Sequence, residues 1–429
     1  MTYITISEYG YIGCDKISTQ NSNFISKRDI DESLFQELYE FWLKDKESQK
    51  VLTFENAKCL KATSYVGLIQ TQNLSVEILP KIYNGEDEDK YRTIFIEMLK
   101  PLLGINEIVV DRADLSTTKN RNIYEMFIKL FIDSIDRLIH KGLKSEYILN
   151  EDNQQFLKGK LKFNEHIRKN IVHKERFYVE YDEYQQNRVE NRVLKSTLQL
   201  LLKKSRESEH RKALRQQLFV FDEVSLSHNY QTDFSKINIH RGMEHYTLPL
   251  RFAKVFLLNE SFTSLRGKED VFALLFPMQT VFEKYMEFVL ENSKEQLGIE
   301  RVLINGGKNE YLLECKMARL QPDYLLEMKD GKKIICDAKW KVLENSEQNE
   351  CKINISSSDV YQIFAYHHFY SARDTAYIFV PNVDGVKRMV LRYNKSNKRI
   401  IVCPVNLEKL KISIDFKFDK EKANIRKNI

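Results

Sequence analysis

Two acidic motifs in the last third of the chain have the residue types and the spacing of a divalent-metal site. Asp323 stands at the start of one predicted strand, and Asp337 stands fourteen residues later, at the end of the next strand, in the triplet Asp337-Ala338-Lys339. A hairpin turned at Asp330-Gly331 brings the two strands side by side, so that both carboxylates converge on one cation. Glu283, on a predicted helix before these strands, supplies a third carboxylate.

Hydrolysis of a phosphodiester is the chemistry that these side chains suit. Carboxylates hold Mg²⁺, with Mn²⁺ as the alternative ion, and the metal neutralises charge in the transition state and lowers the pKa of its bound water. A lysine beside the metal, here Lys339, can orient or deprotonate the attacking water or stabilise the developing negative charge. The motif therefore predicts a site for metal-dependent phosphodiester hydrolysis.

The same residues also have ordinary structural explanations. An aspartate at a strand end is most often a turn or capping residue, and an Asp-x-Lys triplet is frequent by chance. Three features favour the site. The apolar residues 334–336 place Asp337 at the end of a buried strand, Glu283 lies on the helix before, and Gln362-x-x-x-Tyr366 lies on a predicted helix after.

The elements that must position these residues form a predicted α/β module over residues 247–429. Helices are expected over 276–290 and 360–370, and strands over 311–317, 323–328, 333–337 and 375–380. This order predicts a mixed sheet flanked by helices. Asp359, one helical turn before Gln362, is better explained as a cap of the second helix.

Residues 1–90 predict an α+β module. Residues 1–14 and 51–82 alternate between polar and apolar side chains, and 65–70 and 74–79 are typical of two strands around a turn at 71–73. Apolar residues at helical spacing predict an amphipathic helix over 31–44. Lys81, after Pro80, marks a strand end, and contact with a partner is only a weak alternative for it.

Residues 91–246 predict a mainly helical region. Helices are expected over 91–103, 124–140 and 189–203, with strands over 147–149 and 177–181 and a candidate linker over 222–246. Lys158, Lys160 and Lys162 alternate around Gly159. A solvated strand face and contact with phosphate or a partner are equally open for these lysines.

Composition limits the class of protein. The 429 residues carry 67 Lys and Arg against 61 Asp and Glu, a formal net charge of +6, which permits a polyanionic partner without demonstrating one. No apolar stretch approaches the roughly 20 residues needed to cross a bilayer, and no signal-like leader opens the chain. We therefore expect a soluble, cytoplasmic protein without a membrane partner. The six cysteines form no CxxC pair, which argues against zinc or a disulfide framework.

The order Glu283, Asp323, Asp337-x-Lys339 and Gln362-x-x-x-Tyr366 resembles the core of PD-(D/E)xK nucleases, in the variant with a RecB-type Gln-x-x-x-Tyr helix. The resemblance implies metal ligation by the three carboxylates and by the backbone carbonyl of Ala338. It also implies that Lys339 serves the nucleophile and that Gln362 and Tyr366 help to position the site or the DNA backbone.

Motifs spread over about residues 60–380 are similar to the McrC family. They include Ile78-Leu79-Pro80-Lys81-Ile82 and the segments 66–69, 156–161, 181–184, 191–195 and 276–285. The similarity implies the endonuclease subunit of a modification-dependent restriction system, working on double-stranded, methylated DNA. The partner that it implies is a McrB-like AAA+ GTPase hexamer, and this chain would stimulate the GTP hydrolysis of that hexamer. Residues 1–90 are the candidate module for docking to the hexamer.

Two motifs are missing from the sequence, and their absence agrees with the roles that the similarity implies for this chain and its partner. The sequence has no Gly-x-x-x-x-Gly-Lys-Ser/Thr loop, so energy input is expected from the partner. It has no base-reading module such as a zinc finger, so the choice of DNA is expected to lie elsewhere. Two alternatives stay open: a non-catalytic adaptor that activates an AAA+ ring, and a free-standing nuclease of the same superfamily.

Overall fold

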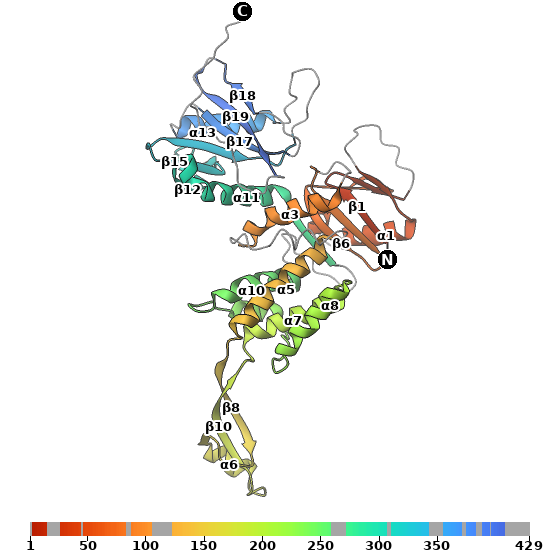
Figure 1. Cartoon of the computed structure of the whole chain (residues 1–429), viewed down its shortest axis with the longest axis vertical. Helices are drawn as coiled ribbons and strands as arrows, with labels where there is room; N and C mark the ends of the chain where they lie inside the picture. The colour runs from red at the N-terminus through yellow and green to blue at the C-terminus, as the bar shows by residue number, and fades with distance from the viewer. Residues whose placement is uncertain are drawn as a thin grey trace, which may run out of the picture. The chain divides into compact units, whose positions relative to one another are not determined.

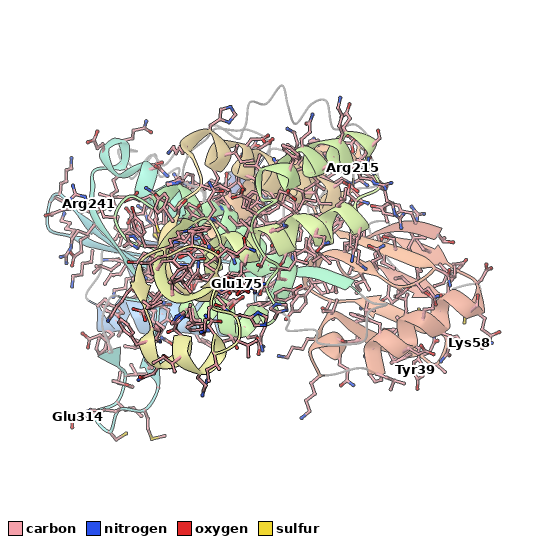
Figure 2. The ribbon with its side chains drawn as sticks, turned by 90° about the horizontal axis from the view of Figure 1, so that it is seen from below. Tyr39, Lys58, Glu175, Arg215, Arg241 and Glu314 are labelled. Atoms are coloured by element: carbon pink, nitrogen blue, oxygen red, sulfur yellow. The ribbon has the colours of Figure 1, made fainter. Side chains whose placement is uncertain are left out.

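The chain packs as two compact units, which we call unit 1 (Met1–Ile123 with Leu265–Ile429) and unit 2 (Tyr124–Ser264) (Figure 1). The structure, a computed structural model, describes residues 2–14, 26–43, 46–82, 87–104, 122–258, 272–306, 310–342, 355–370, 375–382, 388–394 and 396–407. Both ends of the sequence thus contribute to unit 1. Charged side chains such as Lys58 and Arg215 extend into solvent (Figure 2). Among the described residues, no helix has the length and apolar character of a membrane span.

The N-terminal part of unit 1 contains two four-stranded sheets. Their strands are β1 (Thr2–Ser7), β2 (Tyr11–Gly13), β3 (Lys27–Asp29), β4 (Leu52–Asn56), β5 (Cys59–Ala62), β6 (Tyr65–Gln70), β7 (Leu74–Leu79) and β11 (Phe272–Pro277). The sheet orders are β1-β7-β6-β11 and β3-β2-β5-β4. The alternating pattern predicted β6 and β7 correctly to the residue, and they pair antiparallel as expected.

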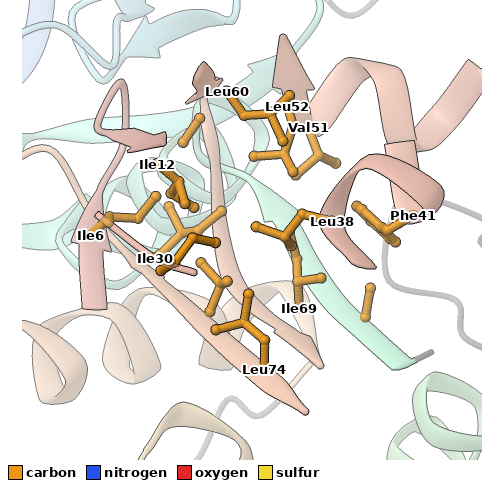
Figure 3. Close-up of a cluster of buried hydrophobic side chains, with 14 of the residues drawn as sticks. Ile6, Ile12, Ile30, Leu38, Phe41, Val51, Leu52, Leu60, Ile69 and Leu74 are labelled. Carbon is orange, nitrogen blue, oxygen red and sulfur yellow. The ribbon is translucent and has the colours of Figure 1, made fainter. Parts of the chain in front are cut away.

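Helices α1 (Glu32–Leu43), α2 (Lys46–Val51) and α3 (Glu88–Leu102) complete this part of unit 1. The helix predicted over 31–44 is confirmed as α1, whose Phe35, Leu38 and Phe41 are buried. Apolar side chains from α1 and from both sheets form one core (Figure 3). Burial of each such aliphatic or aromatic side chain stabilises the fold by about 1.5–3 kcal/mol.

Strand β11 connects the two halves of unit 1. It pairs antiparallel with β6, from Phe272 opposite Gln70 to Pro277 opposite Tyr65. The strands approach closely at Gly67, where a Cβ atom would lie 1.9 Å from the carbonyl oxygen of Leu274. The predicted helix start at residue 276 was therefore wrong. A short apolar run fits a strand as well as a helix, and the helix begins only after Pro277.

The C-terminal part of unit 1 is built on a mixed six-stranded sheet. Its strands are β12 (Ile299–Ile304), β15 (Tyr324–Met328), β16 (Lys333–Ala338), β17 (Thr375–Asn382), β18 (Met389–Arg392) and β19 (Arg399–Asn406), in the order β12-β15-β16-β17-β19-β18. β15 and β16 form an antiparallel hairpin, whereas β16 pairs in parallel with β17. This confirms the predicted mixed sheet.

Helices α11 (Met278–Asn292) and α13 (Ser357–Phe369) cover opposite faces of this sheet. Leu325 belongs to the apolar cluster that contains Ile363 of α13. The preceding residue, Tyr324, donates a hydrogen bond of 2.6 Å to the backbone carbonyl of Glu283 in α11. Successive strand residues point to opposite faces, so the two helices lie on either side. The short helix α12 (Lys294–Leu297) follows α11.

The strand predicted over 311–317 was wrong. Only β13 (Glu310–Tyr311) and β14 (Arg319–Leu320) are extended in this segment, and they pair with each other. Lys316 and Ala318 have φ angles of 59° and 54°, which belong to the left-handed region and interrupt a strand.

Unit 2 is helical, with one β-ribbon. It contains α5 (Ile123–Lys141), α6 (Phe163–Lys169), α7 (Val189–Lys204), α8 (Ser208–Val220), α9 (Tyr230–Lys236), the 3₁₀ helix η1 (Glu244–Tyr246) and α10 (Thr247–Leu258). The ribbon consists of β8 (Glu146–Gln154), β9 (Lys160–Leu161) and β10 (Phe177–Gln185). Residues 222–246, the candidate linker, instead contain α9 and η1. The few periodic cues in this segment suggested a linker, but the segment packs into unit 2: Tyr246 is fully buried and bonds to Asn191.

Candidate active site

The β15–β16 hairpin brings Asp323 beside the end of β16. Gly331 has the positive φ angle of 77° that the predicted Asp330-Gly331 turn requires. Tyr324 lies opposite Cys336, so Asp323 falls at the level of Asp337 and Ala338. One carboxylate oxygen of Asp323 accepts a hydrogen bond of 2.8 Å from the backbone N–H of Ala338. The predicted hairpin therefore brings the two aspartates to the same end of the sheet.

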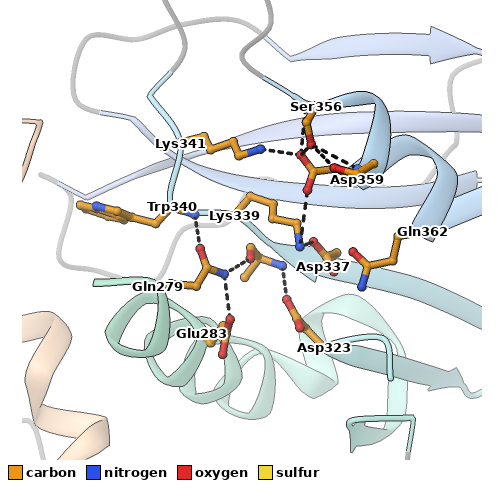
Figure 4. Close-up of polar contacts among 12 residues, drawn as sticks. Gln279, Glu283, Asp323, Asp337, Lys339, Trp340, Lys341, Ser356, Asp359 and Gln362 are labelled. Atoms are coloured by element: carbon orange, nitrogen blue, oxygen red, sulfur yellow. Dashed lines mark hydrogen bonds and ion pairs between the residues drawn. The ribbon is translucent and has the colours of Figure 1, made fainter. Parts of the chain in front are cut away.

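Asp337 is buried and only partly compensated. Its side chain is inaccessible to solvent, and Oδ2 lies 2.8 Å from Nζ of Lys339 (Figure 4). Oδ1 has no hydrogen-bond partner among the described residues. Burial raises the pKa of Asp337, although Lys339 opposes this shift. A buried carboxylate oxygen without a donor is costly, which marks this position for a bound ligand or for strain.

Two further carboxylates lie in the same electrostatic field. Burial, together with the negative charge of Asp337, raises the pKa of Asp323 to about 7. Burial also raises the pKa of Glu283, and Asp337 adds to that shift. Lys339 opposes both shifts, and Lys284 also opposes that of Glu283, but burial still raises both pKa values. The cluster therefore carries an excess of buried negative charge, which a divalent cation can balance.

Lys339 is held as a cation. Burial by itself lowers the pKa of its ammonium group, but the charge and the hydrogen bond of Asp337 outweigh burial, so the pKa is raised. Nζ also lies 3.9 Å from Oδ1 of Asp359. A lysine that keeps its proton at neutral pH suits stabilisation of negative charge better than removal of a proton from water.

Gln279 of α11 is a member of the site that sequence analysis missed. Its Nε2 donates to Oε1 of Glu283 at 2.7 Å and to the backbone carbonyl of Ala338 at 2.6 Å. Its Oε1 accepts from the backbone N–H of Trp340 at 2.9 Å (Figure 4). One amide thus fixes α11 to the end of β16. The available signal was the spacing of Gln279 and Glu283, which share a helix face at i and i+4.

The Gln-x-x-x-Tyr pair lies on α13, on the other face of the sheet from α11. Gln362 is exposed and donates a hydrogen bond of 2.8 Å to the hydroxyl of Tyr366, which is buried. Burial raises the pKa of Tyr366, and Asp337 and Asp323 raise it further. Tyr366 is therefore within electrostatic reach of the aspartates, and Gln362 contacts Tyr366.

Asp359 caps α13, as predicted, and also binds lysine. Ser356 and Asp359 form a reciprocal capping box at the start of the helix. The carboxylate of Asp359 additionally accepts a hydrogen bond from Nζ of Lys341. Hydrogen bonds from Lys341 and Ser356 outweigh burial and lower the pKa of Asp359. Lys341, two residues after Lys339, is a second cation near the site that sequence analysis did not identify.

The donor set fits Mg²⁺ better than a metal that needs a complete protein cage. Among the described residues, no three His, Cys, Asp or Glu side chains converge closely enough to enclose an ion by themselves. Mg²⁺ keeps several waters and is commonly bound through one or two carboxylates together with substrate phosphate. Asp323 and Asp337, with the unpartnered Oδ1 of Asp337, offer such a partial coordination shell.

Solved structures provide a comparison for the whole chain. A chain from a refined half-complex of the tetradecameric assembly of Thermococcus gammatolerans McrB AAA+ hexamers with bound McrC is similar, with a TM-score of 0.69 and 23% sequence identity. The match covers 95% of this chain and 96% of that chain, and it establishes a shared fold. A chain of the Thermococcus gammatolerans McrBC complex gives a TM-score of 0.49 and 26% identity, covering 68% and 88%.

Family membership follows from sequence. No curated protein matches this chain. Residues 60–380, well over half of the chain, match the family described as "McrBC 5-methylcytosine restriction system component". This match confirms the resemblance seen in the sequence. The chain therefore belongs to the McrBC family of 5-methylcytosine restriction system components.

Proposed function

We propose that this chain is the Mg²⁺-dependent DNA endonuclease subunit of a modification-dependent restriction complex, with a PD-(D/E)xK nuclease module in the C-terminal part of unit 1, from α11 onward. The observation that carries the proposal is the buried Asp337, whose Oδ1 has no hydrogen-bond partner within the described part of the chain and which lies with Lys339, Asp323 and Glu283 in one charge cluster. A purely structural cluster would be expected to satisfy such a buried oxygen.

Each residue of the site has a role in this proposal. Asp323 and Asp337 would hold Mg²⁺ or Mn²⁺ with the carbonyl of Ala338, and Glu283, which does not converge with both aspartates, would contribute through a bound water. When bound, the metal supplies charge neutralisation and a more acidic water. Lys339 stabilises negative charge on the phosphate, in keeping with its raised pKa. Tyr366, bonded to Gln362, orients the DNA backbone or the acidic side chains.

We also propose a McrB-like AAA+ GTPase hexamer as the partner. The similar solved chain comes from an assembly of McrB AAA+ hexamers with bound McrC. Residues 1–90 remain the docking module proposed from sequence, and the ribbon of unit 2 offers a second surface. In the segment from β8 to β10, which includes the ribbon and α6, nine large apolar side chains are each more than half exposed: Tyr147, Leu149, Phe156, Leu157, Phe163, Ile167, Ile171, Val172 and Tyr184. Such a concentration is typical of a surface that a partner covers.

The test is cleavage of methylated and unmethylated plasmid in the presence of Mg²⁺. The full chain is assayed alone and with its AAA+ partner and GTP, for the wild type and for Asp337→Asn. Asp330→Asn is the matched control, because Asp330 lies in the turn of the same hairpin and Asn-Gly supports the same turn. GTP hydrolysis is measured in every reaction.

Cutting by wild type and Asp330→Asn, but not by Asp337→Asn, supports the proposed site. GTP hydrolysis should survive in Asp337→Asn, because the lost charge belongs to the nuclease site. Stimulated GTP hydrolysis without cutting in the wild type would instead indicate an adaptor. Cutting by the chain alone, without any effect on GTP hydrolysis, would indicate a free-standing nuclease.

A further inference from the structure

Trp340, which directly follows Lys339, is held from three directions. Its backbone N–H donates to Gln279, and its backbone carbonyl accepts a hydrogen bond from Nζ of Lys81. Its indole N–H donates to the carboxylate of Glu8 at 2.9 Å. Trp340 is 4% exposed. Two of these three contacts come from the N-terminal sheet, more than 250 residues earlier in the sequence.

Glu8, which is buried, and Lys81, which is half-buried, form a single platform. They follow β1 and β7, which pair in parallel up to Ser7 and Leu79, so both residues leave the sheet at the same end. The backbone N–H of Lys81 donates to Glu8 at 2.7 Å, and the backbone N–H of Glu8 donates to the carbonyl of Leu79 at 2.9 Å. Glu8 is 2% exposed. The ammonium of Lys81 lies 5.7 Å from the ring centroid of Trp340.

Glu8 and Lys81 contact Trp340 just beyond the end of β16, where the backbone leaves the sheet. Asp337 and Ala338 end β16, and the last sheet-like bond runs from the backbone N–H of Lys339 to the carbonyl of Phe379 at 2.9 Å. Beyond this bond, the backbone is held by the contacts of Trp340 and by the bond of Lys341 to Asp359. The direction of this backbone in turn constrains where the side chain of Lys339 can lie.

Polar side chains anchor this tryptophan, although apolar residues of similar volume would often stabilise the fold as well, because the carboxyl group of Glu8 is desolvated. The charged groups add direction, because each one bonds to a specific atom of Trp340. Directional bonds to the residue after Lys339 are typical of a positioning role.

We propose that Glu8 and Lys81 are positioning residues of the nuclease site, which act through Trp340 on the backbone that carries Asp337 and Lys339. The inference rests on the proposed function and deepens it, because it makes the N-terminal sheet a part of the nuclease site. It also assigns a role to the lysine of the Ile78-Leu79-Pro80-Lys81-Ile82 motif, which binds within unit 1.

The experiment compares full-length wild type, Lys81→Met and Trp340→Phe. Lys81→Met approximately keeps side-chain size and removes the donor to the Trp340 carbonyl, whereas Trp340→Phe keeps an aromatic ring and removes the donor to Glu8. Lys61→Met is the matched control, because Lys61 lies in the same N-terminal region and packs over the ring of Tyr11. Two constants are measured: the Mg²⁺ concentration for half-maximal plasmid cutting with partner and GTP, and the Kd of Mn²⁺ by calorimetry without DNA.

Both constants are expected to rise about 10-fold in Lys81→Met, the usual cost of losing a group that orients a ligand segment, and to stay at the wild-type value in Lys61→Met. A merely structural role would lower melting temperature and the active fraction without moving either constant. If Lys81→Met and Trp340→Phe both fold and both keep the wild-type constants, the inference is overturned while the proposed function stands. If Lys81→Met does not fold, Trp340→Phe decides. A wild type that neither binds Mn²⁺ nor cuts would overturn the proposed function, and the inference with it.

Discussion

Two buried charge clusters of unit 1 differ in how fully hydrogen bonds and basic partners balance the charge of their carboxylates. At the junction of β7 and α3, Glu77 is inaccessible to solvent and accepts three hydrogen bonds from Arg92, at 2.6, 3.0 and 3.1 Å, and one from the backbone N–H of Ile123 at 2.8 Å. At the end of β16, Asp337 is equally buried, but the residues that the structure describes give it one lysine partner and leave Oδ1 without a hydrogen bond.

The first cluster has the properties of a structural anchor. Arg92 also bonds to Asp89 and Glu88 of its own helix. Burial by itself lowers the pKa of the Arg92 guanidinium, but the hydrogen bonds and charge of Glu77 outweigh burial and raise it. A planar guanidinium matches a carboxylate in geometry, so both charges are satisfied within the protein.

Unit 2 repeats the pattern of the first cluster. Glu125 of α5 accepts hydrogen bonds from Ser205 at 2.9 Å and from the backbone N–H of Arg206 at 2.7 Å, and it pairs with Nδ1 of His210 at 2.7 Å. These bonds outweigh burial and lower the pKa of Glu125. The comparison shows that this chain can satisfy a buried acid, so the deficit at Asp337 is a property of that site.

Asp337→Asn is expected to have the largest effect on activity and little effect on stability. Cutting should fall by at least about 1,000-fold, the upper end for the loss of one charge-stabilising group. The melting temperature should not fall, because the substitution removes a buried charge that the protein compensates only in part. Plasmid cleavage and differential scanning calorimetry measure the two effects. A marked drop in melting temperature would show that Asp337 is a structural anchor after all.

Arg92→Met is expected to have the reverse result, with a large loss of stability. It leaves the carboxylate of Glu77 buried without its main partner, which typically costs about 3–5 kcal/mol in the free energy of unfolding. Both tryptophans, Trp42 and Trp340, lie in unit 1, so tryptophan fluorescence during urea unfolding reports on this unit. Arg301→Met is the matched control: its pair with Glu327 is largely exposed and should contribute less than about 1 kcal/mol.

Gln279→Met tests whether the acidic cluster needs its amide bridge. The variant keeps side-chain length but loses the donor to Glu283 and Ala338 and the acceptor for Trp340. Cutting should fall by about 10- to 100-fold, the usual range for groups that orient metal ligands. Asn292→Ala, at the C-terminal end of the same helix, should cut at the wild-type rate. Equal rates for the two variants would remove Gln279 from the site.

The local part of this architecture was readable from sequence. Alternation located β6 and β7, and the Asp330-Gly331 turn predicted the hairpin that brings Asp323 to Asp337. These features depend on neighbours within about ten residues, where residue type and backbone preference act directly. The mixed sheet and both flanking helices followed from the same kind of pattern.

The remainder depends on contacts between distant segments. The apolar run of β11 became a strand because β6, about 200 residues earlier, offered an edge to pair with. Glu8 and Lys81 reach Trp340 across more than 250 residues. Such contacts leave no periodic signal, because polar side chains that bond at long range look like ordinary surface residues in the sequence.

Glu8 is intermediate between the two kinds of cluster, and it predicts an effect that depends on pH. It has bonding partners in Trp340 and Lys81, yet burial outweighs them and raises the pKa of its carboxyl from 4.5 to about 7. Between these two values the folded chain binds a proton that the unfolded chain does not. The Glu8 contribution to stability is therefore greatest below pH 4.5 and is lost as the pH rises to about 7.

Glu8→Gln should remove this pH dependence, because the amide does not titrate. The free energy of unfolding of the variant, relative to wild type, should increase on the order of 3 kcal/mol between pH 4.5 and 7 and then level off. Urea unfolding at pH 5, 6, 7 and 8, followed by tryptophan fluorescence, measures the difference. A difference that does not change with pH would mean that Glu8 titrates as an ordinary carboxyl. The junction with Trp340 would then resemble the saturated Glu77 cluster more than the deficient site at Asp337.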